Sequence, residues 1–131
     1  MTQGVTHIQV VAAVIERDGR FLVTRRQAGV HLAGMWEFPG GKVGDDESHA
    51  AALERELVEE LDAPVRVGSL LLHTAHEYPD RTVTLFFYRC ELLGTPRPMI
   101  GQEMAWVERD SLASLPFPPA DDELIRVLTS S

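Results

Sequence analysis

Three glutamates near the middle of the chain have the spacing of one helix face. Glu59 and Glu60 follow Glu56 by three and four positions, so on a helix the three side chains share an arc of roughly 100°. Like charges at such spacings lower the stability of a helix by about a few tenths of a kcal/mol per pair, and by more where water is excluded. Arg55 can neutralise one carboxylate, and a divalent cation such as Mg²⁺ or Mn²⁺, which prefers oxygen ligands, can neutralise the others.

Three glutamates alone fit a solvated acidic helix face better, but the surrounding positions favour chemistry. Gly41 is followed by five residues, Glu47, seven further residues and then Arg55-Glu56-Leu57-Val58-Glu59-Glu60. In this loop–helix pattern the chain resembles the Nudix hydrolases. The signature covers Gly41–Ala63, and the likeness extends over almost the whole length.

Other stretches resemble the MutT branch of that family. They are Thr24-Arg25-Arg26, Trp36-Glu37-Phe38-Pro39-Gly40-Gly41-Lys42, Tyr78-Pro79-Asp80-Arg81 and Phe117-Pro118-Pro119-Ala120. The resemblance implies a pyrophosphohydrolase that cleaves nucleoside triphosphates to a monophosphate and pyrophosphate, with 8-oxo-dGTP as the first expected substrate. The alternative is a pyrophosphohydrolase for CTP or a modified dCTP. A non-catalytic Nudix-fold module that only binds nucleotides is less favoured, because the glutamate set is complete.

The resemblance also implies roles for individual residues. Metal ligands, expected to hold Mg²⁺ or Mn²⁺, are the Gly40 carbonyl, Glu56, Glu59, Glu60 and Glu103. Among these, Glu56, Glu59 and Glu103 are the expected catalytic residues, and Glu103 either binds metal or accepts the proton of the attacking water. Substrate contacts are expected from Arg26, Glu37, Phe38, Arg81 and Asp121. The residues that shape the glycine loop and its helix are Gly41, Glu47 and Arg55.

Asp121 is the position that bears on the base, because the family usually has asparagine there as its guanine reader. An amide both donates and accepts, whereas an ionised carboxylate only accepts. A protonated Asp121 could read 8-oxoguanine as the amide does, and the adjacent Asp122 could raise its pKa. An ionised Asp121 suits the exocyclic amine of cytosine, so both bases stay open.

The glutamates require a helix, which the sequence predicts over Ser48–Leu61. Ser48 is a suitable N-cap. The apolar stripe that must face a core consists of Ala50, Leu53, Leu57 and Leu61. Asp62 follows, where the family usually has glycine, so a left-handed C-cap is expected there at a small cost in stability.

The rest of the sequence predicts strands both before and after that helix. Strands are expected over Ile8–Ile15, Phe21–Val23, Val65–Tyr78, Arg81–Leu92 and Glu103–Glu108, a helical turn over Ser111–Leu115, and a terminal helix over Ala120–Leu128. Asp18-Gly19 suits a tight hairpin turn. The strand around Phe86 is apolar on both faces, so its sheet should be covered on both sides. The expected fold class is α/β: a Nudix-type α/β/α sandwich with a central mixed sheet, as a single domain over 1–131.

Composition limits the classes of partner. The 131 residues carry a formal net charge of −8, from 20 acidic and 12 basic residues, which argues against a binder of nucleic acid polymers. The longest N-terminal apolar run, Val10–Ile15, is far shorter than the ~20 residues needed to span a membrane. We therefore expect a cytoplasmic monomer or homodimer that binds a nucleoside triphosphate and no membrane.

Overall fold

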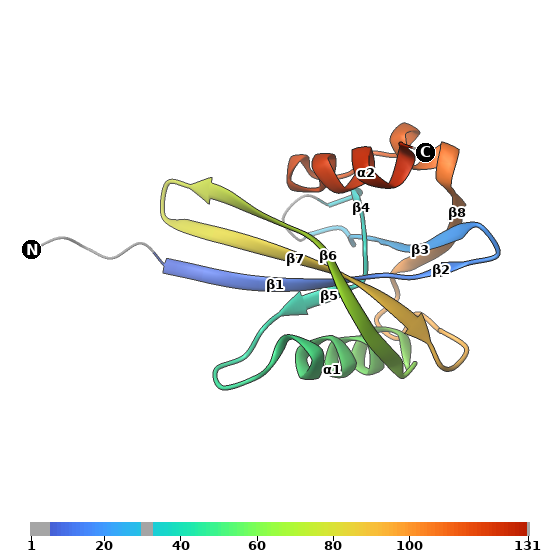
Figure 1. The fold of residues 1–131 in the computed structure, drawn as a ribbon, viewed down its shortest axis with the longest axis horizontal. Helices are drawn as coiled ribbons and strands as arrows, with labels where there is room; N and C mark the ends of the chain where they lie inside the picture. Colours follow the sequence, from blue (N-terminus) through green and yellow to red (C-terminus); the bar gives the residue numbers. More distant parts are fainter. Residues whose placement is uncertain (1–5, 30–32, 131) are drawn as a thin grey trace, which may run out of the picture.

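Two four-stranded sheets form the centre of the computed structural model, which describes residues 6–29 and 33–130 (Figure 1). The first sheet has the order β5-β1-β7-β6. Its strands are β1 (Thr6–Val14), β5 (Gly40–Lys42), β6 (Val65–Tyr78) and β7 (Arg81–Leu92). The β1 and β7 strands run parallel, and the other pairs are antiparallel. The sheet is therefore mixed, as the sequence predicts.

The second sheet is built around β3, which pairs with the other three strands. Its strands are β2 (Glu16–Arg17), β3 (Arg20–Arg25), β4 (Trp36–Glu37) and β8 (Glu103–Glu108). All of its pairs are antiparallel. Asp18 and Gly19 join β2 to β3 with φ angles of 54° and 78°, the positive values that a tight hairpin turn requires. The predicted hairpin is confirmed.

Helices lie on opposite sides of the sheets, so the predicted sandwich is confirmed (Figure 1). The helical elements are α1 (His49–Leu61), η1 (Arg109–Ser114), η2 (Pro119–Asp121) and α2 (Asp122–Thr129). Side chains of β1 alternate between the two cores, as the twofold period of a strand requires. Val11 and Ala13 pack in the cluster that contains Leu57 of α1, whereas Ala12 packs in the cluster that contains Leu124 of α2.

The ends of α1 follow the sequence prediction. The Ser48 side-chain oxygen accepts from the backbone N–H of Ala51 at 3.0 Å, which confirms the N-cap. Asp62 adopts φ 52° and ψ 37°, which confirms the left-handed C-cap.

None of the helices in residues 6–29 and 33–130 is long and apolar enough to cross a membrane.

One part of the predicted apolar stripe is wrong. Leu53 and Leu57 are fully buried, but Ala50 is exposed, and Ala52 is fully buried instead. The buried arc of α1 is turned toward the side that carries Glu56, which is half-buried. Sequence periodicity gives the width of a buried arc better than its centre, since the centre depends on how the helix is rotated against the sheet.

The Ser48 cap yields a prediction about stability. Ser48→Ala removes the acceptor for the Ala51 N–H and should lower the free energy of unfolding by about 1 kcal/mol. Ser48→Asp keeps an acceptor at the same place and should stay close to wild type. Urea denaturation measures both variants, and equal losses in the two would contradict the capping role.

Candidate functional site

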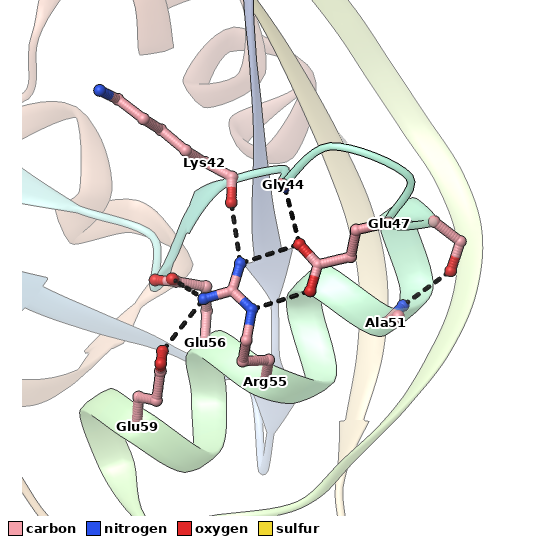
Figure 2. Close-up of polar contacts among 8 residues, drawn as sticks. Lys42, Gly44, Glu47, Ala51, Arg55, Glu56 and Glu59 are labelled. Atoms are coloured by element: carbon pink, nitrogen blue, oxygen red, sulfur yellow. Dashed lines mark hydrogen bonds and ion pairs between the residues drawn. The ribbon is translucent and has the colours of Figure 1, made fainter.

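The guanidinium of Arg55 is the centre of a polar network that joins α1 to the loop before it (Figure 2). Its Nε and Nη2 donate to the two carboxylate oxygens of Glu47, at 2.8 and 2.9 Å. Its Nη1 donates to Glu56 at 2.7 Å and to Glu59 at 3.0 Å. Nη2 also donates to the backbone carbonyl of Lys42 at 3.0 Å. One cation thus contacts three carboxylates and the end of β5.

Hydrogen bonds hold the carboxylate of Glu47 within this network. Hydrogen bonds from Arg55 and from the Gly44 backbone N–H lower the pKa of Glu47 to about 2. Its carboxylate therefore stays ionised and closes the loop between β5 and α1 onto the helix. This geometry supports the proposal that Glu47 helps to shape the glycine loop and its helix.

Gly40 and Gly41 allow β5 to approach its neighbours more closely than any side chain would permit. A Cβ atom at Gly40 would collide with the backbone carbonyl of Val11, and one at Gly41 would collide with the carboxylate of Glu56. Gly40 therefore brings the backbone of β5 directly against β1, and Gly41 brings it against the acidic face of α1.

Glu60 is the most perturbed carboxyl group of this face. Burial raises its pKa to about 8, with further contributions from the charges of Glu56 and Glu37, while a backbone hydrogen bond from Gly40 acts in the opposite direction. Among the described residues, Glu60 takes part in no ion pair. A half-buried carboxyl group without a cationic partner suits a hard divalent cation that displaces its proton.

The donor atoms therefore fit a divalent metal by their chemistry, although they do not yet surround a common point. Within residues 6–29 and 33–130, no group of three or more acidic, histidine or cysteine side chains is arranged as a metal centre. Glu56 and Glu59 are bonded to Arg55, and Glu59 is exposed. A metal ion would require these side chains to turn toward Glu60.

A cavity of about 390 Å³ connects the acidic face of α1 to a partly apolar region. Its lining includes Glu56 and Glu60 from α1 together with Phe38, Tyr78 and Asp121. Carboxylates that could hold a metal and an aromatic-lined pocket that could hold a base thus share one hollow. Tyr78 was not singled out from the sequence, although it begins the stretch that ends in Arg81.

The polar groups of the apolar region interact with one another. Arg26 donates to Glu37 at 2.9 Å, and burial raises the pKa of Glu37 against the lowering effect of Arg26. Asp121 is 5% exposed, and its pKa is raised to about 7 by burial first and then by the charges of Glu37 and Asp122. The expected influence of Asp122 is present, and the influence of Glu37 was not foreseen.

Two other predicted substrate residues have mixed surroundings. The Phe38 ring stacks on Phe117 with centroids 5.5 Å apart, so it belongs to the core as well as to the cavity. The Arg81 guanidinium lies 5.2 Å from the Tyr78 ring centroid, and its buried Nε has no hydrogen-bond partner among the described residues.

Glu103 is not brought to the acidic face of α1. Its side chain does not line the 390 Å³ cavity. It pairs instead with Arg25 at 3.1 Å and lines a neighbouring cavity together with Gly34. The β3–β8 register places Glu103 opposite Arg25.

Gln102, next to Glu103, is a buried polar residue that sequence analysis missed, because a glutamine after a loop glycine has no distinctive pattern.

Comparison with known proteins gives the following matches. The family description "NUDIX domain" matches residues 10–127. The CTP pyrophosphohydrolase of Escherichia coli (strain K12) is 40% identical over 119 residues, which cover 90% of this chain and 88% of that protein. The 8-oxo-dGTP diphosphatase of Haemophilus influenzae is 40% identical over 123 residues, which cover 92% and 90%. The solution structure of the E. coli ORF135 protein matches with a TM-score of 0.82 and 38% identity, covering 95% of this chain and 87% of that chain.

The raised pKa of Glu60 predicts how stability depends on pH without metal. The folded protein binds this proton with a pKa of about 8, whereas the ordinary value is 4.5. The resulting stability is fully present below pH 4.5 and is lost as the pH rises through 8. Glu60→Gln cannot titrate there, so the difference in unfolding free energy between wild type and variant should change across this window, by at most ~1.4 kcal/mol per pH unit.

Urea denaturation in the presence of a chelator at a series of pH values measures that difference. Asp121→Asn is the matched control, because its window should lie lower, between an ordinary value of 3.8 and about 7. A constant difference between wild type and Glu60→Gln from pH 5 to 9 would contradict the burial of an unpaired Glu60 carboxyl group.

Proposed function

Because the chain belongs to the NUDIX domain family and is a hydrolase of phosphoric anhydrides, we propose that it cleaves nucleoside triphosphates to a nucleoside monophosphate and pyrophosphate, with 8-oxo-dGTP as its preferred substrate. The observation that carries this proposal is the shared cavity, in which Glu56 and Glu60 lie together with Asp121 and Phe38. A triphosphate and its base could occupy the two parts of this cavity at once. A nucleotide from the cellular pool would place the reaction in the cytoplasm.

Nudix hydrolases generally require a divalent metal ion, and we propose Mg²⁺ or Mn²⁺ for this one. The ligands would be Glu56, Glu59, Glu60 and the Gly40 carbonyl. When bound, the ion supplies charge neutralisation for the triphosphate and Lewis-acid activation. Arg55 holds the carboxylates of Glu56 and Glu59 next to the glycine loop, so it limits where these side chains can turn.

Glu103 keeps its proposed role as a further metal ligand or as the acceptor of the proton from water. Its carboxylate is exposed and bonded to Arg25, so this role requires that the Arg25 contact is exchanged for one in the cavity. The approach of a polyanionic substrate, which competes for Arg25, would favour that exchange.

For the nucleotide, we propose that Arg26 and Arg81 supply the cationic contacts. Glu37 holds Arg26 through their ion pair, and therefore acts on the substrate through that arginine as well as by lining the cavity. Phe38 presents an aromatic surface to the base. Arg26, Glu37 and Phe38 line the cavity. Arg81 is not part of the lining but lies against Tyr78, which is.

The base preference depends on the proton of Asp121. With a pKa raised to about 7, this carboxyl group is largely protonated below neutrality. The protonated form can donate to O6 of 8-oxoguanine and accept from its N7–H. The ionised form can only accept, which suits the exocyclic amine of cytosine, so hydrolysis of CTP or a modified dCTP is the second candidate function. Relatives at equal identity carry both activities in their names.

The metal assignment predicts that Glu59→Gln loses activity without losing its fold. The amide removes one negative charge and one ligand, and kcat should fall by roughly 100-fold or more. Glu54→Gln is the matched control, because Glu54 lies on the exposed side of the same helix and should keep wild-type activity. Release of pyrophosphate in the presence of Mg²⁺ measures both.

A chelator should stop the wild-type reaction while the circular dichroism spectrum stays unchanged. Near-normal turnover by Glu59→Gln would show that the metal ligands are assigned wrongly. Nucleotide binding by the wild type with no turnover at any Mg²⁺ or Mn²⁺ concentration would instead support the non-catalytic binding module.

Asp121 yields a separate prediction about the base. Asp121→Asn keeps a donor–acceptor pair and should largely preserve the preference for 8-oxo-dGTP over dGTP, measured as the ratio of kcat/KM values. Asp121→Ala should lower that preference by about 10- to 100-fold, the effect of losing buried hydrogen bonds. The wild-type preference should weaken as the pH rises through about 7, whereas that of Asp121→Asn should not.

CTP tests the alternative that Asp121 binds cytosine. If an ionised Asp121 binds the cytosine amine, Asp121→Asn loses a charge-assisted hydrogen bond and CTP turnover should fall markedly. Equal wild-type rates with 8-oxo-dGTP and dGTP, unchanged in Asp121→Ala, would remove this residue from the base pocket.

A further inference from the structure

The loop between β7 and β8 closes over the C-terminal end of α1. An α-helix leaves its last four carbonyls without donors from its own backbone. Here the backbone N–H of Arg97 donates to the carbonyl of Leu61 at 2.8 Å, and that of Met99 donates to the carbonyl of Glu60 at 3.0 Å. The side chain of Gln102 adds a second donor to the Glu60 carbonyl, also at 3.0 Å. Donors far along the chain therefore satisfy the end of this helix.

This helix end needs such support for an electrostatic reason. The C-terminus of a helix carries partial negative charge, and carboxylates are unfavourable there. The last turn of α1 contains Glu59 and Glu60 and no basic residue. Glu60 is also half-buried close to the charges of Glu56 and Glu37. The Glu59 carboxylate therefore disfavours the wound form of the turn that carries Glu60, and the Glu60 carboxylate does so whenever it is ionised.

Gln102 is held on both sides of its amide group. The side chain belongs to a residue that is only 8% exposed. Its amide oxygen accepts from the backbone N–H of Ile100 at 3.0 Å, while its amide nitrogen donates to the Glu60 carbonyl. It also lines a small cavity of about 160 Å³ together with Arg26, Glu37 and Glu60. The amide thus joins the loop to the helix end beside the proposed active site.

We propose that Gln102 is a positioning residue for the metal-binding end of α1. By donating to the backbone carbonyl of Glu60, it keeps the last helical turn wound and the Glu60 carboxylate at the cavity. The inference rests on the proposed function in one respect, the participation of Glu60 in metal binding. It is independent of which base the enzyme prefers.

The test compares Gln102→Ala with a matched control from the same loop contact. Gln27, which is exposed, donates its side-chain amide to the backbone carbonyl of Ile100. Gln27→Ala therefore removes an equivalent glutamine contact to this loop without touching α1. Two measurements on the substrate-free protein are used: the Mn²⁺ dissociation constant from the spin-resonance signal of unbound Mn²⁺, and hydrogen exchange of the backbone amides in residues 60–63.

Gln102→Ala should raise the Mn²⁺ dissociation constant by about 10-fold and accelerate exchange in residues 60–63. Gln27→Ala should leave both quantities within about twofold of wild type. A merely structural loss of loop packing would change both variants alike and would not be confined to the last turn of α1. Equal values for Gln102→Ala and Gln27→Ala would overturn the proposal.

Gln102→Glu separates the two halves of the amide and keeps its volume. The carboxylate can still accept from the Ile100 N–H but cannot donate to the Glu60 carbonyl. Added negative charge alone would strengthen cation binding, so a weaker Mn²⁺ affinity in this variant would support the loss of the helix contact. Unchanged exchange and unchanged or stronger Mn²⁺ binding would overturn the proposal, and this variant decides the matter if Gln102→Ala does not fold.

Failure of the proposed function has a different signature. If Glu59→Gln and Glu60→Gln bind Mn²⁺ as tightly as wild type, the metal assignment itself is wrong and the positioning role is overturned with it. If those variants lose Mn²⁺ binding but the Gln102 variants match Gln27→Ala, only the role of Gln102 is overturned.

Discussion

The contact of one guanidinium with three carboxylates is the interaction on which the rest of the site depends. Arg55 bonds to Glu47, Glu56 and Glu59 and also to the backbone at Lys42. Only arginine presents enough donors in a fixed planar arrangement to satisfy all of these acceptors together, since lysine offers three donors from a single point. Without this cation, the acidic face of α1 would repel itself, and the loop after β5 would lose the ion pairs that join it to the helix.

A second consequence of this charge density appears inside the cavity. Glu60 and Asp121 both have pKa values raised toward neutrality, and the charge of Glu37 contributes to both. Glu37 is in turn held by Arg26. The proposed metal-binding part and the proposed base-binding part of the cavity are thus joined electrostatically through the charge of Glu37. Under the proposed function, a protein with a net charge of −8 would accommodate a polyanion by keeping some carboxyl groups protonated until a cation replaces the proton.

Local features of the fold could be predicted from the sequence because a few neighbouring residues determine them. The Ser48 cap, the left-handed Asp62 and the turn at Asp18 follow from preferences of single residues. The division into two sheets could not be predicted, since it depends on pairings such as Val10 with Leu85 across a large part of the chain. Periodicity likewise could not fix how α1 is rotated against the sheet.

The same distinction explains what could be predicted of the candidate site. The residues of the Arg55 network lie on one loop and one helix, so their spacing alone brings them together. The surroundings of Glu103 depend on the register between β3 and β8, which places it against Arg25. The contact between Gln102 and the Glu60 carbonyl joins segments 42 residues apart. Candidate metal ligands on a short motif can thus be identified from sequence, whereas the groups that hold the motif in place come from distant segments of the chain.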